Sequence, residues 1–180
     1  MATEDALYSD GTRYRPLVIA FREIIDSLSA VKDVLFLGTG IGSGAAILDK
    51  LGHTPEYTLV EIDEAVLEMA LEIMPPARLA LTIPVCANAE EYIKNAVLKY
   101  DLVVVDIFKG RMVPAFVMEI DFLKQIRNTT NQGGISIINY IVADDREWQV
   151  QLQKIQGVFP GCKIIKSGIN RIVISQKLPA

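Results

Sequence analysis

A glycine-rich segment follows the first strongly apolar run of the sequence. Residues 34–37 are apolar, and glycine then recurs at Gly38, Gly40, Gly42 and Gly44 before a helical pattern begins. Glycine lets a ligand approach backbone amides closely, and free amides at the start of a helix attract anionic or polar groups. The segment therefore predicts a binding loop for a nucleotide-like ligand. The alternative is a tight strand-to-helix turn that binds nothing.

Acidic side chains end two later apolar runs. Glu61 lies where a carboxylate can accept hydrogen bonds from the vicinal hydroxyls of a ribose. Asp63 could share that role or simply cap the following helix. Asp106 ends the most apolar run, 102–105, so we expect its carboxylate beside the glycine loop, where it would orient or deprotonate a substrate or else bond to loop amides.

Asn88 offers a further contact, directly after the third predicted strand. Its amide oxygen could accept a hydrogen bond from the exocyclic amine of an adenine. It could equally cap the helix that follows.

The order of strand and helix patterns indicates how these residues are positioned. Strands are predicted at 33–37, 57–62, 81–87, 102–105, 135–140, 163–166 and 171–176, and helices at 14–29, 42–51, 63–73, 89–99, 116–127 and 144–156. Four residues separate the last two strands, which is too few for a helical crossover and predicts an antiparallel hairpin. The pattern predicts an α/β, single-domain, doubly wound Rossmann-like fold with a mostly parallel seven-stranded sheet. Residues 1–12 are expected to be a lead-in and 13–180 the binding domain.

Composition excludes several classes of function. Against 22 acidic residues there are 18 Lys and Arg, giving a net charge of −4, which argues against a nucleic-acid-binding surface. The two cysteines are far apart and His53 is the only histidine, so no metal site is expected. Apolar runs are too short to span a bilayer. We therefore expect a cytoplasmic protein with no membrane partner.

The spacing of the glycines and the predicted C-terminal hairpin bear on which class of nucleotide-like ligand is bound. Gly40-x-Gly42-x-x-Ala45 also fits a dinucleotide fingerprint, which leaves NAD as an alternative. The glycine alternation from Gly38 to Gly44 and the C-terminal hairpin favour S-adenosylmethionine over NAD.

Four segments, 34–42, 59–64, 89–93 and 100–106, together make the sequence resemble the class I S-adenosylmethionine-dependent methyltransferase fold, and more closely its spermidine synthase branch. A fainter similarity covers residues 10–14. The resemblance implies S-adenosylmethionine or its decarboxylated form as cofactor, with no metal. With the residues above, it predicts a cofactor site made of Gly38, Thr39, Gly40, Gly42, Glu61, Ile62, Asn88, Ala89 and Asp106, with Asp106 also catalytic.

Several positions differ from the spermidine synthase pattern. Ile41 and Asn88 stand where that branch has acids, and Lys109 replaces the second acid of its Asp-Ser-x-Asp-Pro motif. A cation there would repel a cationic amine acceptor. Arg15 could bind the carboxylate of intact S-adenosylmethionine. The branch's N-terminal β-rich domain is also expected to be missing.

These differences favour methyl transfer to a small-molecule acceptor. Aminopropyl transfer from the decarboxylated cofactor is one alternative, and a non-catalytic nucleoside-binding domain is another. The predicted substrate-binding residues are Tyr14, Arg15, Phe108 and Tyr140. The helix at 14–29 is a possible homodimer surface.

Overall fold

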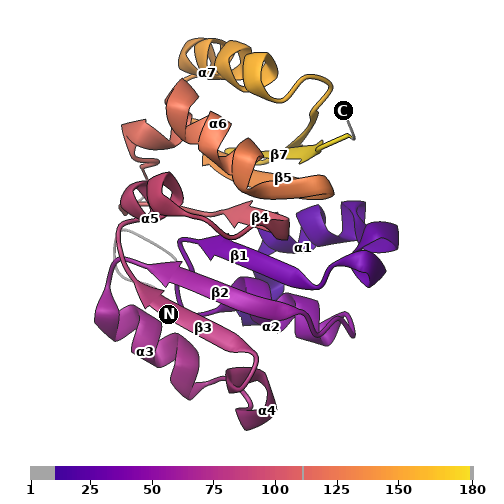
Figure 1. The fold of residues 1–180 in the computed structure, drawn as a ribbon. Coiled ribbons are helices and arrows are strands. Elements are labelled where there is room, and N and C mark those ends of the chain that lie inside the picture. Colours follow the sequence, from indigo (N-terminus) through magenta and orange to yellow (C-terminus); the bar gives the residue numbers. More distant parts are fainter. Residues whose placement is uncertain (1–10, 111, 179–180) are drawn as a thin grey trace.

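Seven strands form a single twisted sheet in the computed structural model, which describes residues 11–110 and 112–178 (Figure 1). The strands are β1 Asp33–Leu37, β2 Glu56–Glu61, β3 Thr82–Cys86, β4 Tyr100–Val105, β5 Thr130–Ile141, β6 Lys163–Ser167 and β7 Asn170–Gln176. Their order is β3-β2-β1-β4-β5-β7-β6. Strands β1 to β5 pair in parallel, whereas β7 is antiparallel to both β5 and β6. The predicted fold class is confirmed.

The order in which strands are added to the sheet reverses at β1: β2 and β3 lie on one side of it, and β4 and β5 on the other. Strand β1 pairs with β2 on one side and with β4 on the other, so the connection from β3 to β4 crosses the sheet. In open α/β sheets, ligands bind outside the carboxyl ends of the strands at such a switch point. The loops that follow β1, β2 and β4 therefore mark the place for a site.

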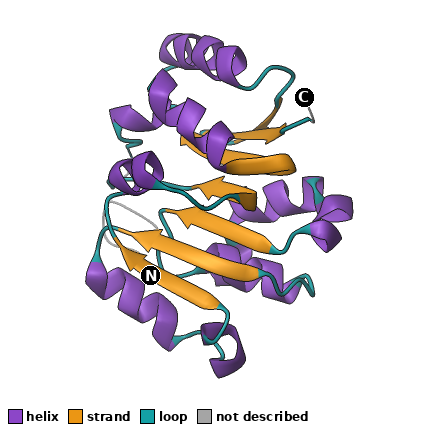
Figure 2. Cartoon of the chain, in the orientation of Figure 1, coloured by secondary structure: helices purple, strands orange, loops and turns teal. Residues whose placement is uncertain are grey.

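Helices flank both faces of the sheet (Figure 2). The α-helices are α1 Arg15–Glu23, α2 Ser43–Lys50, α3 Glu64–Glu72, α4 Pro76–Leu79, α5 Ala89–Asn95, α6 Ile120–Thr129 and α7 Asp145–Val158. Three 3₁₀ turns accompany them: η1 Gly11–Arg13, η2 Ile25–Ala30 and η3 Ala115–Met118.

Strand β1 shows how the core divides between these faces. Val34 and Phe36 pack with α1, α2 and α3, whereas Leu35 and Leu37 pack with α5, α6 and α7. Successive side chains of a strand point to opposite faces, so a continuous apolar strand fills both layers.

Several predicted boundaries were wrong. The predicted helix 14–29 is α1 followed by η2, and 116–127 is η3 followed by α6. The predicted helix 89–99 ends at Asn95, and β5 begins at Thr130 rather than at residue 135. Apolar spacing does not separate a 3₁₀ turn from an α-helix, and the early part of β5 is polar and joins β4 through a register shift.

The sequence patterns also missed the short helix α4, which begins at Pro76. Proline suits the first turn of a helix because its missing N–H would have no partner there. Of the predicted lead-in 1–12, residues 1–10 lie outside the described part of the chain, and Gly11 and Thr12 belong to η1.

In the described part of the chain, every helix is too short or too polar to cross a bilayer. The same residues contain no group of three or more His, Cys, Asp or Glu side chains arranged to hold a metal ion.

Candidate functional site

The glycine loop after β1 is shaped by its contact with the end of β4. Gly38 has φ +82°, and a Cβ there would lie 2.5 Å from the carbonyl oxygen of Asp106. Its amide and that of Thr39 donate to the carbonyl of Val60 at 3.0 and 3.2 Å. Gly38 is therefore needed for close packing of β1 against β4, a reason that differs from the predicted one, ligand access to the amides.

Glu61, the last residue of β2, is hydrogen-bonded to this loop. The Gly40 amide donates to its Oε2 at 2.9 Å, and the amides of Ile62 and Asp63 donate to its Oε1 at 2.9 and 3.3 Å. The three backbone amides fix the orientation of the Glu61 side chain beside the glycine loop.

Two neighbouring side chains act as helix caps. Oδ1 of Asp63 accepts from the amides of Ala65 and Val66 at 3.0 and 3.3 Å. Oδ1 of Asn88 accepts from the amide of Glu90 at 2.7 Å. The capping alternative is therefore seen for both. An amide oxygen has two lone pairs, so the adenine contact of Asn88 stays a prediction.

Asp106, directly after β4, forms a hydrogen-bonded triangle with Tyr14 and Asn139. The hydroxyl of Tyr14 donates to its Oδ1 at 3.1 Å, and Nδ2 of Asn139 donates to the same atom at 2.8 Å. Nδ2 of Asn139 also donates to the hydroxyl of Tyr14 at 3.1 Å. Within the described residues both of these hydrogen bonds go to Oδ1, and none reaches Oδ2.

Sequence analysis predicted Tyr14 and Asp106 but missed Asn139. Asn139 lies on β5, its side chain is buried, and its Oδ1 accepts from Nδ2 of Asn170 at 2.9 Å. A lone amide within the apolar run of β5 was the available signal, because buried polar groups require partners.

Burial controls the protonation of this triangle. It raises the pKa of Asp106 to about 6, while the hydrogen bonds from Asn139 and Tyr14 act in the opposite direction. Burial and the nearby Asp106 carboxylate raise the pKa of Tyr14 well above its usual value, so its hydroxyl stays a donor. A carboxylate with a pKa near 6 is ionised at neutral pH and still basic enough to take up a proton.

The remaining predicted residues are spread over the same edge and beyond it. Gly42 precedes α2, Ala89 begins α5 and Ile62 is exposed after β2. Arg15 is exposed at the first position of α1, and Phe108 is half-buried after β4.

Tyr140 does not contact Tyr14, Asp106 or Asn139 through a side-chain hydrogen bond in the described part of the chain. It packs on the other face of the sheet, where its hydroxyl donates to Glu147 at 3.0 Å and its ring lies 5.6 Å from that of Trp148. Adjacent strand residues point to opposite faces, so Tyr140 and Asn139 cannot both face Tyr14.

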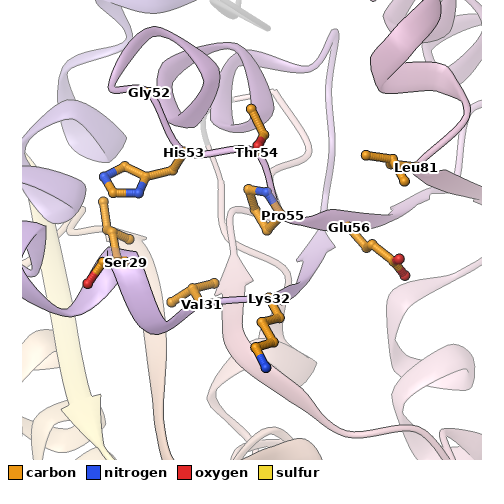
Figure 3. A pocket seen from close by; sticks show the side chains of 10 residues that line it. Ser29, Val31, Lys32, Gly52, His53, Thr54, Pro55, Glu56 and Leu81 are labelled. Atoms are coloured by element: carbon orange, nitrogen blue, oxygen red, sulfur yellow. The ribbon is translucent and has the colours of Figure 1, made fainter.

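A hollow of about 410 Å³ lies at the opposite edge of the sheet (Figure 3). Lys32 and Glu56, at the amino ends of β1 and β2, line it together with Ser29, His53 and Thr54. It is therefore separate from the edge that carries Glu61 and Asp106.

Two curated proteins with similar sequences are named as polyamine aminopropyltransferases. A polyamine aminopropyltransferase from Vibrio vulnificus (strain CMCP6) is 28% identical over 148 residues, which are 79% of this chain and 49% of that protein. A probable polyamine aminopropyl transferase from Bifidobacterium longum (strain NCC 2705) is 26% identical over 117 residues, which are 64% of this chain and 26% of that protein. The chain thus spans half or less of the length of these curated relatives.

Solved structures share the fold. A probable spermidine synthase from Corynebacterium glutamicum ATCC 13032 superposes with a TM-score of 0.76 at 19% identity, covering 92% of this chain and 64% of that one. Human methyltransferase-like protein 13 in complex with SAH gives a TM-score of 0.74 at 21% identity, covering 93% and 82% of the two chains. At these identities the likeness shows the fold alone.

The family is shown by the match along the chain itself. Residues 24–167 match the spermine/spermidine synthase domain, and this range includes the glycine loop, Glu61, Asp106 and Asn139. The chain belongs to the spermine/spermidine synthase domain family.

Proposed function

We propose that the chain transfers an aminopropyl group from decarboxylated S-adenosylmethionine to a small amine. The observation that carries the proposal is the ionisable carboxylate of Asp106, held by Tyr14 and Asn139 at the switch point of the fold. Sequence analysis favoured methyl transfer. The names of the curated relatives instead support aminopropyl transfer.

The residues present fit an adenosyl donor. Backbone amides hold the Glu61 side chain beside the glycine loop, where its oxygens could accept hydrogen bonds from the two hydroxyls of a ribose. Such a donor supplies a carbon activated by a sulfonium and a neutral thioether as leaving group.

Asp106 would act on the acceptor. Its Oδ2 would accept a hydrogen bond from the amine, orient the nitrogen lone pair toward the activated carbon and take up the proton that the amine loses. A carbon–nitrogen bond forms as the carbon–sulfur bond breaks, and methylthioadenosine leaves. Holding both reactants in line supplies much of the rate acceleration in such a displacement.

Methyl transfer from intact S-adenosylmethionine is the second candidate. Lys109, exposed after β4, favours it because a cation three residues from Asp106 would repel a diamine. Asp106 would serve in the same way, but the product would be S-adenosylhomocysteine.

The test is to identify the product. The protein is incubated either with the decarboxylated donor and a panel of diamines or with the intact donor and the same panel, and adenosyl products are quantified by mass spectrometry. We expect methylthioadenosine with the decarboxylated donor, and loss of turnover in Asp106→Asn with donor binding retained. S-adenosylhomocysteine alone would establish the second candidate, and donor binding without either product would overturn both.

A further inference from the structure

A chain of side-chain amides continues behind Asp106. Nδ2 of Asn170, at the start of β7, donates to Oδ1 of Asn139, whose Nδ2 donates to Asp106 and Tyr14. In the β5–β7 pairing Asn139 lies opposite Ile172, so Asn170 is its diagonal neighbour on the same face. The β6–β7 hairpin is thereby linked to the carboxylate at the end of β4.

The direction of this chain is fixed by what each group can do. An ionised carboxylate only accepts hydrogen bonds, so the amide end of Asn139 that faces Asp106 must be its NH₂ group. Its oxygen then faces Asn170, which must present its own NH₂ group. A reversed Asn139 would place an acceptor against the carboxylate, which would then keep only the hydroxyl of Tyr14 as a donor among the described side chains.

The placement of Asn139 is costly unless its polar atoms are used. Its side chain is 1% exposed, and the neighbouring β5 residues Ile137 and Ile138 belong to the apolar core. An amide that is buried without hydrogen-bond partners destabilises the folded state, whereas an apolar residue at the same position would not. Among the described residues its side chain makes three hydrogen bonds, and all of them lie within the network of Asp106.

We propose that Asn139 and Asn170 are positioning residues for Asp106. Asn170 keeps the Asn139 amide in the direction that the carboxylate requires, and Asn139 holds the carboxylate as an anion with Oδ2 turned to the acceptor. The inference rests on the proposed function only in giving Asp106 an acceptor to orient.

The other described groups that contact Asp106 come from the start of α1 and from β1, not from the hairpin. Among the described residues, Tyr14 from the start of α1 is the titratable side chain in contact with Asp106, and β1 contributes backbone at Leu37 and Gly38. Arg171 follows Asn170 but points to the other face, where it pairs with Asp145 at 3.3 Å. The amide chain is therefore the route by which the hairpin reaches Asp106.

The test uses Asn139→Leu, Asn170→Ala and the double variant. Asn131→Ala is the matched control, because Asn131 donates to Oδ1 of Asp101 at 2.8 Å near the opposite end of β4. The readout is the pH midpoint of the Asp106 carboxyl carbon in the NMR spectrum of protein labelled with ¹³C-aspartate, assigned by the loss of the signal in Asp106→Asn. The pH midpoint of turnover is measured beside it.

We expect Asn139→Leu to raise the Asp106 midpoint by about one pH unit, because a donor to a charged group is lost. Asn170→Ala should raise it by roughly half as much, and the double variant should match Asn139→Leu, since Asn170 acts only through Asn139. Asn131→Ala should leave the midpoint unchanged.

A midpoint in Asn170→Ala equal to that of the control would overturn the inference, as would additive shifts in the double variant. Asn170 is half-buried beside a hairpin turn, so Asn170→Ala keeps the test decisive if Asn139→Leu does not fold. The NMR midpoint needs no turnover. Shifted midpoints in a protein without activity would therefore retain the positioning roles and remove only the proposed function.

Discussion

The close packing of Gly38 against Asp106 predicts an unusually large cost for one added methyl group. Gly38→Ala places a side chain in the left-handed region and sets its Cβ 2.5 Å from the backbone oxygen of Asp106. Gly52→Ala is the matched control, since Gly52 has φ +84° and no described heavy atom lies within 4 Å of its added Cβ. The two variants share the backbone strain and differ in the clash.

The magnitudes follow from these two terms. Left-handed backbone costs a non-glycine residue about 1–2 kcal/mol, and the stiffer unfolded chain returns about 0.4–1 kcal/mol. Gly52→Ala should therefore lower the free energy of unfolding by about 1 kcal/mol. The clash adds about 1–3 kcal/mol by analogy with overpacked cores, so Gly38→Ala should lower it by about 2–4 kcal/mol.

Urea unfolding followed by tryptophan fluorescence measures both variants. Trp148 is the single tryptophan of the chain and is buried, so its emission reports global unfolding. Because the clash bears on the backbone of Asp106, Gly38→Ala should also weaken turnover, whereas Gly52→Ala should not. Equal losses of stability in the two variants would refute the packing role assigned to Gly38.

Four further outcomes follow from the site. Because the pKa of Asp106 is about 6 when folded and about 3.9 when unfolded, the native state binds the extra proton between these values. The free energy of unfolding should fall relative to Asp106→Asn by up to about 3 kcal/mol as pH rises from about 4 to 6, and a constant difference in urea titrations would exclude the raised pKa. Tyr14→Phe should cost about 1 kcal/mol and move the pH midpoint of turnover upward, since the lost hydroxyl stabilised the carboxylate; a midpoint at or below that of the parent would contradict its role. Glu61→Gln should weaken adenosyl ligands at least about tenfold in thermal-shift titrations, with the exposed Glu68→Gln as control, and equal affinities would remove Glu61 from the ribose site. Lys109→Asp should raise kcat/KM for a diamine by about fivefold, as expected for about 1 kcal/mol of relieved repulsion, and no change would show that Lys109 lies away from the acceptor.

The fold, and the edge of the sheet at which Glu61 and Asp106 lie, can be predicted from sequence patterns alone. Apolar runs of strand length, separated by helical patterns, require a parallel sheet, and the short link before β7 requires a hairpin. Glu61 and Asp106 each end such a run, so the topology delivers both to the carboxyl edge. These features are encoded locally, which is why they could be predicted.

The contacts between side chains that are distant in sequence become visible only in the folded chain. Tyr14 lies 92 positions before Asp106 and Asn139 lies 33 after it, and no local pattern links them. Strand register places Asn139 on the face of Asp106 and Tyr140 on the other face. The reason for glycine at position 38 likewise depends on how closely β1 passes β4. Contacts of this kind depend on how strands pair and pack, a property of the whole folded chain.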